Sequence, residues 1–435
     1  MRRFLIIGIL LLLPCLIISP VLVLHFVSAD SALVASSTTI DSRTAARIKR
    51  IVRQIEYASY FNRTWTLVIT QQDLNGILAM GARAVKRIKA TGSISGAHGT
   101  ILNFSLHSPE NPFGQFINIT VITAPDSDGI TIRQLKIGQL SLHDRVAQSI
   151  IESAIAYLLG EQHSADVLNA VKTISTRNNK LIIQYQPLPN LGKIVAHGLN
   201  QSGLIGGDLK AFATPAAIRF HYQELCQQFD AKKTRALTHY LADRFSDAAL
   251  RSNTLEQAIT ENRAALTALA IFFGSYKFNT IINAIPANEI KRCQRRASKP
   301  HLAGRKDLSL HFIYSAMIKL MSDSNISWTV GEFKELSDAF RGGSGFSFTD
   351  LAADQAGIQF ATFATQPSTA RELHKRTELL EDESNFFPSV ADLSEGISQQ
   401  QFEQDYGGIE GETYLTLVDD INTRIHQLPL YKNIH

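Results

Sequence analysis

The sequence predicts an α+β protein with an N-terminal transmembrane helix, a β-rich membrane-proximal domain and a mainly α-helical domain. Three observations predict this class: a long apolar run opens the chain, strand-like runs fill residues 64–187, and helical periodicity follows from residue 190. With 435 residues, 45% of them hydrophobic, the chain exceeds what one core usually organises. We therefore expect a transmembrane signal anchor (1–29), a stalk helix (30–63), an α+β domain with a β-meander (64–189) and a helical domain (190–435).

The expected anchor is the run from Phe4 to Val27, which contains no Asp, Glu, Lys or Arg. As a helix it would rise about 36 Å, against about 30 Å of hydrocarbon in a bilayer. A cleaved signal peptide is the competing interpretation, because Val27, Ser28 and Ala29 offer small residues at a plausible cleavage point. Signal-peptide cores usually hold about 7 to 15 apolar residues, so the length favours an uncleaved anchor.

Charge and cysteine content place the rest of the chain outside the cytoplasm. Arg2 and Arg3 favour a cytoplasmic start, which predicts a single-pass protein of the inner (cytoplasmic) membrane with a periplasmic body. Outside the apolar run the only cysteines are Cys226 and Cys293. In an oxidising compartment they would form a disulfide, and the alternative is a pair of buried free thiols.

Residues 41–187 are predicted to form one helix followed by an α+β unit. Apolar residues at helical spacing predict a stalk helix over 41–60. Beyond it, strand-like runs such as "TWTLVIT" and "FINITVITAP" alternate with two helical segments, "QQDLNGILAMGARAVK" and "HDRVAQSIIESAIAYLLG". The segment "TAPDSDGIT" carries an Asp-Ser-Asp-Gly sequence between two such runs, which predicts a hairpin turn.

The segment "ITQQDLNGIL" contains a short T-x-x-[DE]-LN element, formed by Thr70, Asp73, Leu74 and Asn75. With the preceding strand and the following meander, it resembles the extracytoplasmic domains of YpmS-like single-span proteins. This resemblance implies a curved sheet with a groove for an apolar ligand. The alternative is a structural module that holds the C-terminal part away from the membrane.

Residues 190–305 are predicted to be helical almost throughout. The apolar segment "ALTALAIFF" is too short to span a membrane and is expected to be a buried core helix. His221 and His239 lie eighteen residues apart, without the i, i+4 spacing of paired metal ligands on a helix. We therefore interpret both histidines as structural.

Polar stripes mark three consecutive helices between residues 303 and 357. The first helix carries Asp307, His311 and Ser315 at spacing four, and such residues share one face. The other two carry acids: Glu335 and Asp338 on one, and Asp350 and Asp354 on the next. Between these two helices lies a glycine-rich break at Gly342, Gly343 and Gly345.

The same region shows family resemblances. Its pattern "HF-x-x-SA", "KE-x-x-D", "G-[FW]-S-[FW]-x-DL-x-x-D-x-x-G" resembles YfiM-like lipoproteins and, more distantly, VanZ-like membrane proteins, in which short helices carry a His, a Glu and Asp residues. The matching positions are His311, Phe312, Ser315, Ala316, Lys334, Glu335, Asp338, Gly345, Phe346, Ser347, Phe348, Asp350, Leu351, Asp354 and Gly357. The chain departs from the first family by its anchor and large N-terminal domain, and from the second because Lys319 makes the His helix a poor span. The whole chain also resembles uncharacterised single-span proteobacterial envelope proteins that end in "FFPSVADL" and "LPLY".

Three interpretations of this polar cluster remain open. The first is a buried hydrogen-bonded network that fixes helix register. The second is a metal or acid/base site formed by His311, Glu335, Asp338 and Asp354, with Asp350 nearer the surface in the first turn of its helix and Ser347 as N-cap. The third is an anion or ligand cradle, which could serve for cofactor binding, at Gly342, Gly343 and Gly345, although a phosphate-loop spacing is lacking. Ser315 is expected to be a structural serine, because no nucleophile elbow surrounds it.

These observations predict a membrane-anchored cell-envelope protein that serves as a scaffold or binding factor. The alternative is a metal-assisted or acid/base hydrolase of an envelope lipid or glycan. The sequence identifies no metal, cofactor or substrate. The expected partners are the membrane, through residues 4–27, and an envelope lipid or protein. A net charge of only +4, with Lys and Arg spread along the chain, argues against a nucleic-acid partner.

Overall fold

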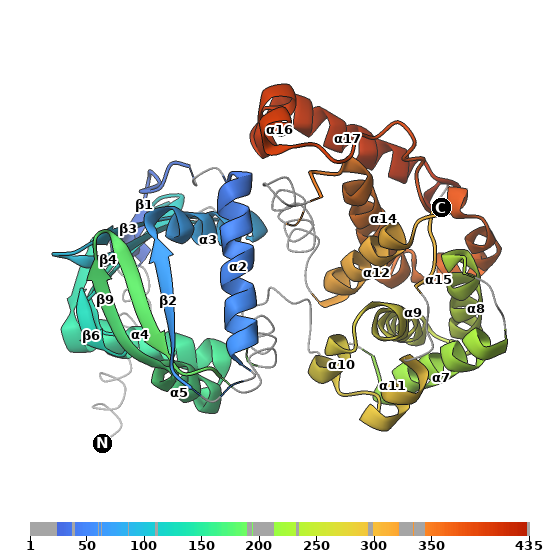
Figure 1. Ribbon diagram of the computed structural model, residues 1–435, viewed down its shortest axis with the longest axis horizontal. Helices are drawn as coiled ribbons and strands as arrows, with labels where there is room; N and C mark the ends of the chain where they lie inside the picture. The colour runs from blue at the N-terminus through green and yellow to red at the C-terminus, as the bar shows by residue number, and fades with distance from the viewer. Residues whose placement is uncertain are drawn as a thin grey trace, which may run out of the picture. The chain divides into compact units, whose positions relative to one another are not determined.

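The computed structural model describes most of the chain and divides it into two units (Figure 1). The described residues are 24–36, 40–59, 61, 63–85, 87–108, 112–188, 194, 213–231, 235–294, 299–321, 334 and 344–432. The first unit consists of Met1–Ile40 and Arg50–Pro189, and the second of Asp41–Lys49 and Asn190–His435. Among the described residues, the two sheets lie in the first unit, where helices alternate with the strands, and the second unit is helical.

The first unit is built on two antiparallel sheets. In the larger sheet the strand order is β3-β4-β5-β7-β8, and β1 also pairs with β5; in the smaller sheet it is β2-β10-β9-β6. The strands are β1 (Ser28–Ala29), β2 (Trp65–Thr70), β3 (Ile88–Ser95), β4 (Gly99–His107), β5 (Phe116–Thr123), β6 (Asp126–Asp128), β7 (Ile132–Ile137), β8 (Leu140–His143), β9 (Val171–Arg177) and β10 (Lys180–Tyr185).

Helices pack on both sheets and enclose two apolar clusters. The helices of this unit are α3 (Gln71–Ala84), α4 (Asp144–Leu159), α5 (Glu161–Ala170) and the part of α2 (Ser42–Ala58) that begins at Arg50; residues 42–49 of α2 belong to the second unit. Ile51 and Ile55 of α2 pack against the first cluster, which contains Leu67 and Leu74, so this part of the predicted stalk contributes to a core. Ala147 of α4 packs in the second cluster.

The T-x-x-[DE]-LN element joins α3 to two strands. Thr70, the last residue of β2, is the N-cap of α3; its side chain accepts from the Asp73 amide at 3.3 Å, and Asp73 Oδ2 accepts from the Thr70 amide at 2.9 Å. Asn75 Oδ1 accepts from the Gly92 amide of β3 at 2.7 Å. The element therefore has a structural role in this chain: it begins a helix and bonds that helix to the backbone of a strand.

The connection between β5 and β7 differs from the predicted hairpin. The two strands are antiparallel neighbours, but the "DSD" segment between them forms β6 and pairs with β9 of the other sheet. A two-residue turn would keep the chain in one sheet. Here the Asp and Ser residues instead carry the chain from one sheet to the other and back.

The predicted fold class is wrong in one part, the transmembrane helix. Within the described residues, none of the helices combines the length and the apolar character that crossing a membrane requires. Residues 4–23 of the predicted span lie outside the described residues. The end of that run bonds to the larger sheet: the Phe26 carbonyl accepts from the Gln139 amide at 2.8 Å, and Ser28 and Ala29 pair with β5. Backbone groups that are bonded to a sheet do not continue a membrane helix.

The second unit is helical and surrounds α9 (Figure 1). Helices α7, α8, α12, α14 and α15 all contact α9. The helices are α7 (Pro215–Ala231), α8 (Leu237–Leu250), α9 (Leu255–Leu269), α10 (Lys277–Ile282), α11 (Ala287–Gln294), α12 (Lys306–Met321), α14 (Phe348–Thr365), α15 (Ala370–Lys375), α16 (Gln399–Tyr406) and α17 (Glu412–His426). Short turns of other helix types are η1 (Ala270–Gly274), η2 (Thr377–Glu381), η3 (Glu383–Asn385), η4 (Gly408–Glu410) and η5 (Pro429–Tyr431).

The apolar segment "ALTALAIFF" is a buried core helix, as predicted. It forms the end of α9 and continues into the π-helical turn η1, and all of its residues are buried. The neighbouring polar residue Asn262 is also buried and is fully used: its amide donates to the carbonyls of Ala364 and Ala370, and its Oδ1 bonds to His374 Nε2 at 2.7 Å. This asparagine therefore ties α9 to α14 and α15.

A disulfide joins two helices of this unit, which confirms the predicted pairing of Cys226 and Cys293. Cys226 lies on α7 and Cys293 on α11, and their Cα atoms are 5.7 Å apart. The bond closes a loop with a sequence separation of 67 residues. On the loop-entropy model a closed loop of this size stabilises the folded state by about 4 kcal/mol.

Helices α12 and α14 approach closely because of Gly357. A Cβ atom at this position would lie 2.2 Å from the backbone oxygen of Phe312, far inside van der Waals contact. Gly345, one of the residues predicted for a ligand cradle, has φ +90°, and a Cβ there would lie 2.3 Å from the backbone of Gly396. Gly345 thus allows a close approach of two backbone segments. Gly342 and Gly343 lie outside the described residues.

We expect Gly357→Ala to lower the free energy of unfolding by about 1 to 3 kcal/mol, because the added methyl group must push α12 and α14 apart. The measurement is urea denaturation followed by circular dichroism. Gly81→Ala in α3 is the matched control, since a Cβ there meets nothing within 4 Å. That change should instead stabilise its helix by up to about 1 kcal/mol. A stabilising Gly357→Ala would contradict the close-packing explanation.

Candidate functional site

The centre of the candidate site is His311 of α12, which lies between two carboxylates of α14. His311 Nδ1 is 3.0 Å from Asp354 Oδ1, and His311 Nε2 is 3.2 Å from Asp350 Oδ2. The two aspartates lie four residues apart and so face the same side of α14. Both ring nitrogens therefore face acceptors, and only the imidazolium form can donate to both at once. We call His311, Asp350 and Asp354 the ion triad.

Local sequence signals place the two aspartates. Ser347 is the N-cap of α14, and its side chain accepts from the Asp350 amide at 3.0 Å, which confirms the predicted cap. Asp350 consequently stands in the first turn, where a carboxylate also offsets the helix dipole. Asp354 follows one turn later, towards the contact at Gly357 that brings α12 near.

Asp354 is the most enclosed member of the triad. Its side chain is 4% exposed, compared with 13% for Asp350 and 11% for His311. Asp354 Oδ1 also accepts from Ser315 Oγ at 2.6 Å. Ser315 thus uses its proton on a carboxylate, as a structural serine does, and His311 presents no lone pair to activate it.

Two more cations surround Asp350. Arg305 Nη2 lies 3.6 Å from Asp350 Oδ1, and Lys334 Nζ lies 3.6 Å from Asp350 Oδ2. Arg305 also pairs with Asp307, at 2.6 Å, and with Glu395, at 2.7 Å. The second negative charge of the triad is therefore balanced by cations that lie nearer the surface, which lowers the cost of burying it.

These contacts set the protonation state of His311. Burial by itself lowers the pKa of the imidazole, but the charges and hydrogen bonds of Asp354 and Asp350 outweigh burial and raise the pKa to about 10. For Asp350, burial raises the pKa, and the opposing hydrogen bond and charge of His311 together with the charge of Lys334 bring it below its usual value. His311 is thus a cation at neutral pH, and its lone pairs are not free to bind a metal or accept a proton.

The structure brings together only part of the predicted set. His311 and Asp354 meet as expected, whereas Glu335 and Asp338 lie outside the described residues. Asp307 shares a helix with His311, yet its hydrogen bonds go to Arg305. Within the described part of the chain, no three His, Cys, Asp or Glu side chains are arranged to hold a metal ion.

Sequence reasoning missed an apolar cavity beside the triad. The cavity has a volume of about 380 Å³. Its apolar wall comes from three residues of α12, Leu310, Tyr314 and Ile318. The other lining residues are polar: Asp307, His311, Ser315, Lys334 and Asp354. These three residues recur at spacing four. Leu310 and Tyr314 directly precede His311 and Ser315 of the polar stripe, so α12 presents a second stripe next to the polar one. That spacing was the signal that could have revealed the cavity wall.

His221 and His239, the two histidines predicted to be structural, have different surroundings. His221 is fully buried, and its Nε2 lies 3.0 Å from Glu261 Oε2. Glu261 also accepts from Arg251 Nε at 2.9 Å. Burial lowers the pKa of His221, and the effect of Glu261 only partly opposes it. His239 lies on α8 and has its Nδ1 3.3 Å from Thr238 Oγ1.

Comparisons with protein-family models, curated proteins and solved structures found no match to this chain. The resemblances to YfiM-like, VanZ-like and YpmS-like proteins, and to single-span proteobacterial envelope proteins, therefore stay predictions.

The pKa of His311 predicts a pH dependence of stability. Because the folded pKa of about 10 lies above the ordinary value of 6.5, the triad contributes fully below pH 6.5 and its contribution is lost as pH rises towards 10. Relative to His311→Gln, wild-type protein should lose stability over this interval by up to about 1.4 kcal/mol per pH unit. The measurement is urea denaturation at pH 6, 8 and 10.

The control for this experiment is His426→Gln, which changes an exposed histidine of α17. Its stability should follow the wild-type curve over the whole interval. If wild type and His311→Gln instead gave parallel curves, His311 would not carry a proton in the folded state that it loses on unfolding.

Proposed function

We propose that this chain is a binding factor of the cell envelope and that the ion triad organises its binding site without catalysing a reaction. The observation that carries the proposal is the position of His311 between two carboxylates, 3.0 and 3.2 Å from its two ring nitrogens. A histidine general base needs a free lone pair at the working pH. His311 donates both ring protons, so its chemistry suits the fixing of two helices rather than proton transfer.

The ligand that we propose is the acyl part of an envelope lipid. The cavity beside the triad has the volume of a small-molecule site, and Leu310, Tyr314 and Ile318 supply an apolar wall. Its charged lining residues are two cations, His311 and Lys334, and two anions, Asp307 and Asp354, so the charges balance. Such a lining favours an uncharged apolar group, which gains from burial and leaves no charge unpaired.

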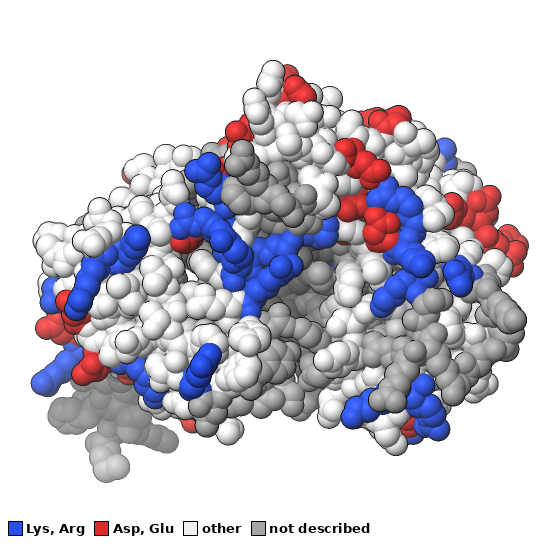
Figure 2. Space-filling model, in the orientation of Figure 1, with Lys and Arg blue, Asp and Glu red and all other residues white. Residues whose placement is uncertain are grey.

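The compartment that we propose is the space outside the cytoplasm. The disulfide between Cys226 and Cys293 supports this, because such bonds persist in oxidising compartments and are rare in the cytosol. Mixed charges also favour a lipid or protein partner over nucleic acid. On the face of the molecule that Figure 2 shows, the second unit carries both acidic and basic side chains.

The hydrolase alternative receives less support from the same geometry. A metal-assisted mechanism needs His311 as a ligand through a free nitrogen, and an acid/base mechanism needs it to accept a proton. Both nitrogens already donate to carboxylates. We therefore do not propose a reaction at this site.

Binding can be measured with N-phenyl-1-naphthylamine, an uncharged apolar fluorophore whose emission rises in an apolar cavity. We expect the probe to bind wild-type protein and Leu310→Trp to weaken binding at least tenfold, because the indole fills the cavity. Leu415→Trp is the matched control: it adds the same side chain at a half-exposed leucine of α17 that does not line the cavity. Equal binding by the three proteins would overturn the proposed site.

The compartment can be tested separately. We expect alkaline phosphatase fused after His435 to be active in a bacterial host, and Cys226 and Cys293 to resist alkylation in the denatured, unreduced protein. Both results require export into an oxidising compartment. An inactive phosphatase together with an active cytoplasmic reporter at the same position would place the body in the cytoplasm.

A further inference from the structure

A second cavity lies beside the disulfide, between α7 and α11. Its volume is about 510 Å³. Arg219, Tyr222 and Cys226 of α7 line one side, and Glu289, Arg292 and Cys293 of α11 line the other. It has no lining residue in common with the cavity beside the ion triad.

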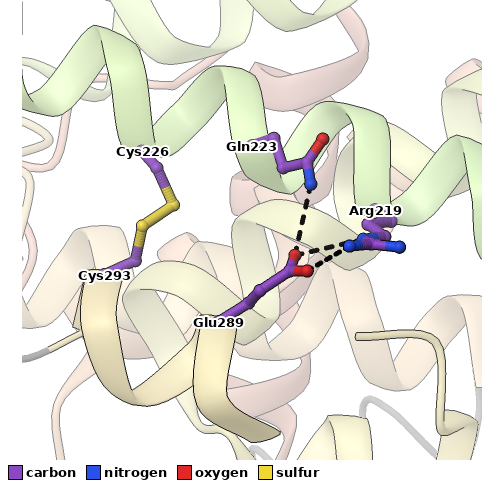
Figure 3. The surroundings of a disulfide bond; sticks show 5 residues. All are labelled: Arg219, Gln223, Cys226, Glu289 and Cys293. Carbon is purple, nitrogen blue, oxygen red and sulfur yellow. Dashed lines mark hydrogen bonds and ion pairs between the residues drawn. A yellow bond between two sulfur atoms is a disulfide. The ribbon is translucent and has the colours of Figure 1, made fainter. Parts of the chain in front are cut away.

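The single carboxylate that lines this cavity, Glu289, is paired with residues of α7. Figure 3 shows Glu289 of α11 pointing to Arg219 and Gln223 of α7. Arg219 donates through Nε at 3.1 Å and through Nη2, and Gln223 Nε2 donates at 3.2 Å. Arg219 lowers the pKa of Glu289, so this carboxylate is ionised and neutralises one guanidinium. Because Arg292 adds a second positive charge, the net charge of the lining residues is positive.

Tyr222, one of the lining residues, carries a buried hydrogen-bond donor. Tyr222 is fully buried, and among the described residues its hydroxyl has no hydrogen-bond partner. Burial, with a smaller contribution from the charge of Glu289, raises the pKa of Tyr222 to about 12. The hydroxyl therefore keeps its proton at neutral pH and can donate it. A buried polar group of this kind is uncommon and calls for a partner.

The remaining wall is aromatic. The ring of Phe272 lies 5.6 Å from the ring of Tyr222 in an edge-to-face arrangement, and Phe229 lies 5.8 Å from Phe272. Phe229 and Phe272 both line the cavity. Aromatic walls favour the planar apolar body of a ligand.

We propose that the cavity between α7 and α11 binds a small aromatic or apolar molecule that carries one anionic group. Arg292 supplies the opposite charge, the Tyr222 hydroxyl donates to the ligand, and Phe229 and Phe272 contact its apolar body. The disulfide holds the two sides of the cavity together. This site is separate from the lipid site proposed above.

The probe that tests this site is 1-anilinonaphthalene-8-sulfonate, which is N-phenyl-1-naphthylamine with an added sulfonate. We expect it to bind the full chain and Arg292→Glu to raise its Kd at least tenfold, because the variant makes the lining negative. Tyr222→Phe, which keeps the ring and removes only the hydroxyl, should raise the Kd about three- to tenfold. Fluorescence titration gives all of these constants.

Two controls separate this site from general charge and from the other cavity. Lys291→Glu makes the same charge change on α11 at a residue that does not line the cavity, and it should alter the Kd less than about threefold. Leu310→Trp should leave binding of the anionic probe intact even where it removes the uncharged one. Equal losses in Arg292→Glu and Lys291→Glu, or loss of the anionic probe in Leu310→Trp, would overturn the proposal.

Discussion

The second unit depends on one buried ionic interaction, in which the His311 imidazolium lies between Asp350 and Asp354. Removing one partner of such a group leaves an uncompensated charge in a low dielectric, which is far more costly than the net gain from forming it. The two ion pairs of His311 thus join α12 to α14 in the observed register. Gly357 makes that register possible by letting the backbone of Phe312 approach.

The same interaction shapes what the unit can do. A histidine that two carboxylates keep protonated is a poor general base, but it can hold two helices together. The cavity of the proposed lipid site lies beside the two helices that His311 joins. The unit then contains two cavities with different chemistry. The one beside α12 has balanced charges and a wall of Leu310, Tyr314 and Ile318, whereas the one between α7 and α11 has a positive lining with two phenylalanines. This difference is the basis on which we propose two kinds of ligand.

Much of the fold could be predicted from periodicity and capping. Strand-like runs and helical spacing located most elements, and Ser347 was recognisable as a helix start by its side chain. The transmembrane helix was the main error, because apolar length says nothing about backbone pairing, and Phe26, Ser28 and Ala29 bond to the larger sheet. The role of "DSD" as a strand of a second sheet was likewise invisible, since its partner β9 lies more than forty residues away in the chain.

The sequence by itself determined which residues share a helix face: His311 with Ser315, Asp350 with Asp354, and Leu310 with Tyr314 and Ile318. Spacing alone decides this, because the helix repeat is a local property. Only the tertiary structure decided that His311 faces both aspartates, that Asp307 pairs with Arg305 instead, and that the imidazole is charged. The charge state of His311 and the shape of the cavity depend on groups that are distant in the chain. The distances between these groups are set by how closely α12 and α14 pack.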